Sequence, residues 1–205
     1  MIISREHKFI YFKSYKTAST SIEIFLYAYC NHPDDIITRI GASVVKPPWY
    51  KPRNFKGYQN HSMVHEINPR LFDGYFIFTS VRHPVDKMLS LFHVKRGKDF
   101  NNFIDNFNFG DPRKAFMYPF YSLGNKVVAN DMIRYETLRG DLRRVCDTLG
   151  LKYDDKYLLH CRKSERRQVD IHDWTVGKIE KEFARDYDTL GYGGFEQVNG
   201  YIHAC

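Results

Sequence analysis

Short apolar runs alternate along the chain with segments whose apolar residues recur every three or four positions. The runs KFIYF (8–12), YFIFTSV (75–81) and KVVANDMIRY (126–135) are typical of buried strands. Helical spacing follows each run, with the predicted buried positions Ile22, Phe25, Leu26 and Tyr29, then Val85, Met88, Leu89 and Phe92, then Leu138, Leu142, Val145 and Leu149. Because strands that alternate with helices pair in parallel, we predict a single α/β domain over residues 1–205 with a central parallel sheet flanked by helices. Ligands bind such sheets beyond the carboxyl ends of the strands.

Capping and breaking residues indicate where the helices begin and end. Ser, Thr and Ser at positions 19–21 are expected to cap the first helix, and Pro84 stands at the start of the second. A last helix is predicted over residues 174–190, closed by Gly191. Residues 33–60 contain four prolines and the pair Trp49–Tyr50, which favours an irregular loop over a site rather than a second domain.

Composition and charge narrow the class of protein. A chain of 205 residues with 43% hydrophobic residues is long and apolar enough for a full-sized core, which excludes a disordered protein. The net charge of +7 favours an anionic partner, although a basic chain can also be basic for solubility alone. The four cysteines show neither a CxxC pair nor metal-ligand spacing, so we expect no metal site and no disulfide framework. The start MIISREHK lacks a signal-peptide pattern and no stretch approaches 18 apolar residues, so we expect a cytoplasmic protein without a membrane span.

The stretch YKTASTS (15–21) joins the first strand to the first helix. A helix N-terminus offers unpaired N–H groups to a phosphate-like anion, and Lys16 and the hydroxyl residues add donors. The Walker pattern GxxxxGK[ST] is not met, because no glycine lies between Lys13 and Ser21. An ordinary helix start rich in Ser and Thr explains this stretch about as well.

A second strand-to-helix junction, TSVRHPVDKMLSLF (79–92), strengthens the anion-binding interpretation. Arg82 follows the strand, where a guanidinium can bind a phosphate through two hydrogen bonds. Ser90 lies about two turns into the next helix and can face the same pocket. Either residue alone would be read as a surface arginine or a small packing serine.

Together the two stretches resemble the PAPS-dependent sulfotransferase family, and most of all its carbohydrate branch. YKTASTS is similar to the family loop for the 5′-phosphosulfate, and VRHPVDKMLSLF to the family segment for the 3′-phosphate. IRYETLRGDLRRVCDTLGL (133–151) and DYDTLGY (186–192) resemble later family segments. The resemblance spans most of the chain. It implies a P-loop-like sulfotransferase fold, with PAPS (3′-phosphoadenosine 5′-phosphosulfate) as donor, PAP as product and no metal.

The resemblance also implies roles for individual residues. The implied cofactor-binding residues are Lys16, Thr17, Ala18, Ser19, Thr20, Ser21, Arg82, Ser90, Tyr135 and Lys163. Tyr135 matches a family tyrosine that stacks near the adenine, although a core tyrosine is almost as good an interpretation. Lys163 belongs to the basic run CRKSERRQ (161–168), which either closes over the 3′-phosphate or forms a solvated charged loop.

Four positions depart from the family pattern. Tyr15 replaces the usual proline, Ala18 the usual glycine, His83 an Asp or Asn, and Lys87 an arginine. None of these changes removes a charged group that the cofactor needs. Glycine at position 18 is dispensable if the methyl group of alanine fits.

The stretch YQNHSMVHEINPRLF (58–72) contains the candidate acid–base residues. His61 is the first candidate, because an imidazole with a pKa near 6.5 suits removal of a hydroxyl proton near neutral pH. His65 and Glu66 are the rivals, and a polar cluster that caps a helix is the alternative to any catalytic role. We therefore predict Lys16, His61 and Glu66 as the catalytic candidates, with Lys16 stabilising charge on the leaving group.

Two other classes of protein share some of these features. A P-loop-type nucleotide-dependent kinase would use the same lysine and helix terminus, but it normally needs a carboxylate for magnesium at a strand end, and neither of the first two strands ends in Asp. A non-enzymatic binder of nucleic acid or acidic glycan suits the charge, but it does not require Lys16 and Arg82 at two strand ends. We expect a sulfotransferase whose acceptor is a carbohydrate or small alcohol, with residues 33–60 and 109–121 shaping the acceptor pocket. No nucleic-acid partner is expected.

Overall fold

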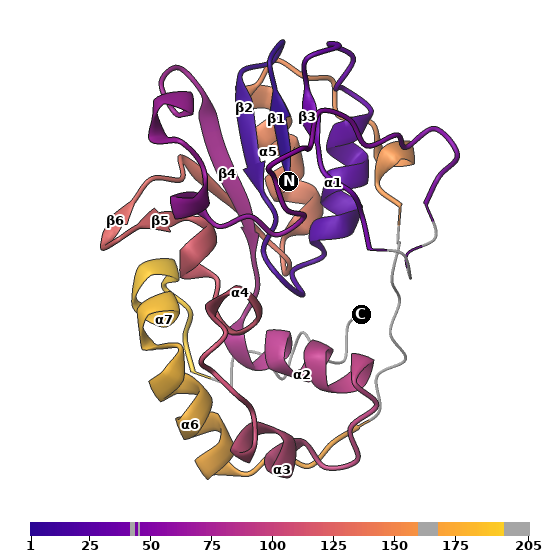
Figure 1. The fold of residues 1–205 in the computed structure, drawn as a ribbon. Coiled ribbons are helices and arrows are strands. Elements are labelled where there is room, and N and C mark those ends of the chain that lie inside the picture. Colours follow the sequence, from indigo (N-terminus) through magenta and orange to yellow (C-terminus); the bar gives the residue numbers. More distant parts are fainter. Residues whose placement is uncertain (42–43, 45, 160–167, 195–205) are drawn as a thin grey trace.

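A five-stranded sheet with the order β3-β1-β2-β4-β7 forms the centre of the fold (Figure 1). The structure is a computed structural model that describes residues 1–41, 44, 46–159 and 168–194. Its parallel strands are β2 (Phe9–Phe12), β4 (Phe76–Val81) and β7 (Asp131–Arg134). β1 (Ile2–Ser4) runs antiparallel to both β2 and β3 (Ile36–Ile37). The predicted α/β class with a central sheet is therefore confirmed, and the sheet is mostly parallel, with β1 as the antiparallel strand.

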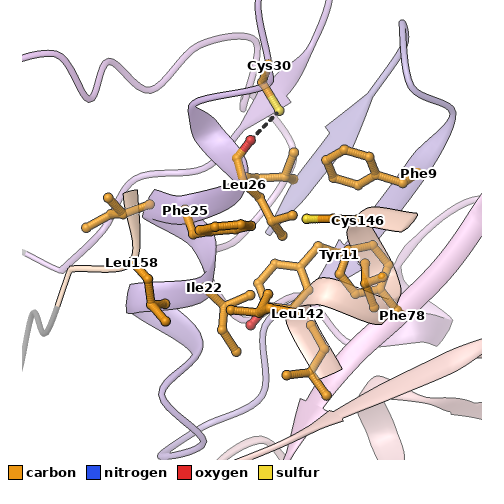
Figure 2. Packing of buried hydrophobic residues seen from close by; sticks show 14 of the residues in the cluster. Phe9, Tyr11, Ile22, Phe25, Leu26, Cys30, Phe78, Leu142, Cys146 and Leu158 are labelled. Carbon is orange, nitrogen blue, oxygen red and sulfur yellow. Dashed lines mark hydrogen bonds between the residues drawn. The ribbon is translucent and has the colours of Figure 1, made fainter. Parts of the chain in front are cut away.

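Alternating side chains divide the strands between two apolar layers. Figure 2 shows one layer, in which Phe9, Tyr11 and Phe78 of the sheet pack against two helices. These helices are α1 (Ser19–Tyr27) and α5 (Leu138–Thr148). Ile10 and Ile77 face the other layer, where the short turns η1 (Val64–Glu66) and η3 (Tyr118–Phe120) cover the sheet. Each large apolar side chain buried here contributes about 1.5–3 kcal/mol, which fixes the start of α1 close to the end of β2.

A group of helices with its own apolar cluster lies beyond the carboxyl ends of the parallel strands (Figure 1). Its members are α2 (Pro84–Val94), α3 (Phe100–Asp105), α4 (Pro112–Ala115), α6 (Asp173–Glu182) and α7 (Ala184–Leu190). The four predicted apolar positions of α2 face this cluster, together with Phe100, Ile179 and Phe183. α2 therefore lies across the carboxyl ends of the strands and does not pack on a face of the sheet (Figure 1).

Two predicted elements are divided in the structure. The last helix breaks at Phe183, which has φ −97° and ψ 15° and ends α6 before α7 begins. Phe183 is buried against Phe109 and Phe116, so tertiary packing overrides the continuous helical spacing. The third predicted strand contributes only β7 to the sheet. Its first part, β6 (Lys126–Val127), turns back on β5 (Ser122–Leu123) as a hairpin.

The described part of the segment 33–60 is irregular, as predicted, apart from β3 and an isolated bridge between Ile37 and Arg53. Its aromatic pair packs against Tyr27, with ring centroids 5.6 Å away for Trp49 and 4.7 Å away for Tyr50. Tyr27 is the last residue of α1, so this pair lies at the opposite end of the helix from the phosphate-loop candidate. The remaining short turns are η2 (Pro69–Leu71) and η4 (Asp155–Tyr157). None of the helices in the described ranges has both the length and the apolar character needed to span a membrane.

Candidate active site at the carboxyl edge of the sheet

The three parallel strands end on the same side of the sheet. The segments that follow them bring the predicted anion-binding residues together. Lys13 follows β2, Arg82 follows β4 and Tyr135 follows β7. Nη1 of Arg82 donates a hydrogen bond to the carbonyl oxygen of Lys16 over 3.1 Å. The guanidinium of Arg82 also stacks on the ring of Tyr135, 3.8 Å from its centroid. Three segments that are far apart in sequence therefore meet in one site.

The loop before α1 has an unusual backbone. Lys16 and Ala18 both adopt left-handed conformations, with φ 66° and φ 57°. Ala18 is the N-cap of α1 and no side chain caps this end, so the prediction that the Ser and Thr residues cap the helix is wrong: they lie within its first turn. In the described part of the chain, the backbone N–H groups of Ala18, Ser19 and Thr20 donate to no protein acceptor. These donors and the helix dipole make this end of α1 suitable for a phosphate or sulfate group.

A buried network of hydroxyl groups supports the loop from inside. Oγ1 of Thr17 lies 2.6 Å from Oγ of Ser80 and 3.0 Å from Oγ of Ser14. The hydroxyl group of Tyr11 lies 2.9 Å from the same Ser80 oxygen. Thr17 is fully buried and its hydroxyl is committed to this network, so its side chain is not available to an anion. Ser14 and Ser80 have structural roles that the sequence pattern did not reveal.

Arg82 is the cation best prepared for an anionic ligand. Its side chain is only 4% exposed, and its Nε donates to Oδ2 of Asp86 over 2.7 Å. Nη2 is also buried, yet it has no hydrogen-bond partner in the described residues. A buried donor without an acceptor costs about 1–3 kcal/mol, more when the group is charged, so an anion that accepts from Nη2 would be bound strongly. Ser90 is buried on α2, one helical turn after Asp86, so the two side chains lie on the same side of the helix.

The residues around Tyr135 fix the end of β7. The ring of Tyr135 is half-buried, with one face against Arg82, and its backbone N–H bonds to Val81. Next to it, Oε1 of Glu136 accepts the backbone N–H of His83 over 2.7 Å. Nε2 of His83 donates to the carbonyl oxygen of Gly193 over 3.1 Å, so the departure from the family Asp or Asn ties the start of α2 to the segment after α7.

Lys87, another departure from the family pattern, is committed to hydrogen bonds within the protein. Its ammonium group is fully buried and donates to the carbonyl oxygens of Lys114 and Ala115. Burial lowers the pKa of Lys87 from 10.5 to about 7, and the charge of Asp186 opposes this shift. Lys87 therefore fastens α4 to α2.

His61 is held in a defined orientation beside the loop. Its Nδ1 lies 2.7 Å from the carbonyl oxygen of Lys13, which can only accept, so Nδ1 carries the ring proton. The ring of Tyr15 packs edge-on against the imidazole at 5.2 Å. Nε2 is left as the proton acceptor of the neutral ring. Burial, followed by the positive charge of Lys13, lowers the pKa of His61 from 6.5 to about 3, which corrects the expectation of an ordinary value near 6.5.

The rival candidate Glu66 is engaged in local structure. Its Oε2 accepts the backbone N–H of Met63 over 2.9 Å, and its Oε1 pairs with Arg113. Both carboxylate oxygens therefore stabilise the η1 turn and its contact with α4. His65 is exposed on the same turn. Of the three candidates, His61 is the partly buried one whose ring is fixed beside the loop by a hydrogen bond, with Nε2 left as its proton acceptor. Lys163 lies outside the described residues.

Comparison with known proteins identifies the family. A model described as "Sulfotransferase family" matches residues 1–193. The chain belongs to the sulfotransferase family. No curated protein and no solved structure matches it. Family membership makes the protein a transferase of sulfuryl groups, and it does not support the kinase and non-enzymatic alternatives. The described residues contain no group of three His, Cys, Asp or Glu side chains that could hold a metal ion.

Proposed function

We propose that this sulfotransferase moves the sulfuryl group of PAPS to a hydroxyl or amine group of an acceptor, with a carbohydrate as the leading acceptor class. The observation that carries the donor assignment is the buried Nη2 of Arg82, which has no hydrogen-bond partner within the described ranges and lies next to an uncapped helix terminus. PAP and PAPS carry two anionic groups, at the 3′ and 5′ positions, and the site offers two separate sets of donors. A nucleotide with a 5′-phosphate alone would leave Arg82 without its acceptor.

The 5′-phosphosulfate is assigned to the loop and the first turn of α1. Lys16 is half-buried there and supplies a positive charge, while the N–H groups of Ala18, Ser19 and Thr20 supply hydrogen-bond donors. The 3′-phosphate is assigned to Arg82 and Ser90, and the adenine to the neighbourhood of Tyr135. Because Arg82 bonds to the carbonyl of Lys16, binding at one set of donors also orders the other.

PAPS supplies a sulfuryl group on a good leaving group, and the protein supplies charge and a proton acceptor. The acceptor oxygen or nitrogen forms its bond to sulfur while the bond between sulfur and the bridging oxygen breaks. We assign Lys16 the stabilisation of the negative charge that develops on that bridging oxygen. Nε2 of His61 is the atom assigned to take the acceptor proton.

The carbohydrate assignment rests on weaker support than the donor. The matched segments resemble the glycan branch, and the net charge of +7 suits an acidic sugar. Small alcohols are the competing class of acceptor.

Calorimetry against a set of nucleotides tests the donor assignment. PAP should bind far more tightly than 5′-AMP, ATP with magnesium, or an oligonucleotide. Equal affinity for PAP and AMP would remove the 3′-phosphate assignment, and a preference for ATP with magnesium would favour a kinase. A PAPS-consuming assay across acidic glycans, neutral glycans and small alcohols then tests the acceptor class, since the proposal expects turnover with a glycan before any simple alcohol.

A further inference from the structure

Lys13 and Glu23 form a fully buried ion pair between the phosphate loop and α1. Nζ of Lys13 donates to Oε2 of Glu23 over 2.6 Å, and the two side chains are 1% and 0% exposed. Oε1 of Glu23 accepts from the amino group of Met1 over 2.9 Å and from the hydroxyl of Thr38 over 3.2 Å. Removing two charges from water costs so much that a buried ion pair is weak evidence for stability. The hydrogen bonds around the pair indicate another role.

Lys13 holds the segment that carries His61 at two points. Its ammonium group donates to Oδ1 of Asn60 over 3.0 Å. Its carbonyl oxygen accepts from Nδ1 of His61 over 2.7 Å. The side chain of Lys13 is itself fixed by Glu23, which belongs to the helix that follows the loop. The chain of contacts therefore runs from α1 through Lys13 to the imidazole.

We propose that Lys13 and Glu23 are positioning residues that hold His61 in the tautomer and orientation that a proton acceptor needs. This inference rests on the proposed role of His61 as the base. Both residues act through His61, because their charged groups are paired with each other inside the protein. The carbonyl of Lys13 keeps the ring proton on Nδ1 and so keeps the lone pair on Nε2.

Burial and the charges around His61 set its pKa. A variant that only destabilised the fold would not shift this pKa in the folded protein, so the pKa is a readout of positioning. The groups that act on the imidazole are the ammonium of Lys13 just after β2, the amino group of Met1 just before β1, and the carboxylate of Glu23 on α1. The ring of Tyr15 is its aromatic neighbour. The first two groups lower the pKa of His61 and Glu23 raises it. Removing the charge of Lys13 should therefore raise the pH at which His61 titrates.

The test compares Lys13→Met with the double variant Lys13→Met/Glu23→Gln, which removes one charge of each sign and keeps a hydrogen-bond acceptor at position 23. Lys178→Met is the control, because Lys178 also belongs to a cation–carboxylate pair, with Asp105 at 3.1 Å, but lies on α6 and not in a segment assigned to the active site. NMR of the imidazole nitrogens in the free protein reports the tautomer and the titration midpoint. Steady-state kinetics report kcat, and calorimetry reports PAP affinity.

The proposal expects an Nδ1-protonated ring in the wild type and an upward shift of the His61 midpoint in Lys13→Met. The shift should be smaller in the double variant, because the raising effect of Glu23 is also lost. Since a small misplacement of a catalytic group costs up to about 100-fold, kcat of Lys13→Met should fall by roughly 10- to 100-fold, with PAP affinity changed much less. Lys178→Met should leave the His61 titration midpoint and kcat close to wild type.

An unchanged midpoint and tautomer in both variants would overturn the positioning role, and so would a loss of PAP affinity as large as the loss of kcat. Failure of the proposed function looks different. If His61→Ala kept full turnover, His61 would not be the base, while the NMR comparison would still decide whether Lys13 sets the state of the imidazole.

Discussion

Nη1 of Arg82 donates to the carbonyl oxygen of Lys16 over 3.1 Å, and this single bond joins the two loops that the proposed donor must occupy together. The bond turns the carbonyl of Lys16 toward the guanidinium, and Lys16 itself adopts a left-handed backbone with φ 66°. The Nη2 atom of the same guanidinium is buried and has no hydrogen-bond partner among the residues that the structure describes. This bond couples the two loops that are proposed to bind the anions, so a substitution in one loop should also affect the other.

Arg82→Ala should weaken PAP binding by at least tenfold. Hydrogen bonds to charged groups contribute about 1.5–3 kcal/mol each, and this variant removes both the proposed phosphate contact and the bond to Lys16. Affinity for 5′-AMP should change much less. Calorimetry with both nucleotides measures the difference, and Lys178→Ala, in an exposed ion pair with Asp105, is the control. An equal loss for PAP and AMP would show that Arg82 only supports the fold of the loop.

Lys16→Met should reduce turnover more than it weakens PAP binding. A positioned ammonium stabilises charge that appears as the sulfuryl group leaves, so its removal acts on the transition state. Steady-state kinetics and calorimetry on the same preparation separate the two effects. Near-normal turnover would make Lys16 only a residue of the helix-capping loop. Thr20→Ala should have a smaller effect on turnover, because backbone N–H groups also donate hydrogen bonds to the proposed 5′-phosphosulfate.

His61→Ala should reduce kcat by about 10²–10⁴-fold with nearly unchanged PAP affinity, since a general base contributes about that much. Glu66→Gln is the matched comparison, because Glu66 is held by Arg113 and the backbone of Met63. It should keep most of the activity. If the two outcomes were reversed, Glu66 would be the base; loss of PAP binding in His61→Ala would make His61 a structural residue.

The pH dependence should show that His61 stays neutral far below pH 6.5. Its pKa in the folded protein is about 3, so kcat/KM, which reports the free enzyme, should have no acid limb with a midpoint near 6.5. The sign for stability follows from the same shift. As pH falls below 6.5 the unfolded chain takes the proton first, so the free energy of unfolding should decrease between pH 6.5 and about 3. Chemical denaturation of wild type and His61→Ala should show a weaker decrease in the variant.

Ala18→Gly should stabilise the protein. Ala18 has φ 57°, and the left-handed conformation costs about 1–2 kcal/mol for a residue with a side chain. Glycine also raises the conformational entropy of the unfolded chain, which lowers stability by about 0.4–1 kcal/mol. The net increase in the free energy of unfolding is therefore expected to be up to about 1 kcal/mol. Ala28→Gly is the control, because Ala28 has φ −60° at the other end of α1. There the same change should lower the free energy of unfolding. Denaturant titration decides, and a loss of stability in Ala18→Gly would contradict the assigned backbone strain.

Part of the order of strands and helices was predictable, because these elements depend on local periodicity, whereas β1, β3, α3 and α4 were not predicted. Alternating apolar runs and helical spacing placed β2, β4, α1, α2 and α5. The two loops were predictable for a related reason: a lysine with hydroxyl residues, or an arginine with a serine, stands at a strand-to-helix junction within a few residues. Such short-range patterns led to the sulfotransferase family, which the match over residues 1–193 confirms.

What only the tertiary structure decided depends on burial and on partners far along the chain. Phe183 breaks the last helix because its ring is packed against Phe109 and Phe116, which no helical pattern contains. Thr17 turns inward because Ser80, on another strand, offers its hydroxyl. In the sequence Lys13 is one of many basic residues. The fold buries its side chain against Glu23 and brings its carbonyl oxygen within hydrogen-bond distance of His61. The pKa of His61 follows from that burial, because a charge is costly where water is excluded, and no local sequence pattern reports how much water a side chain will lose.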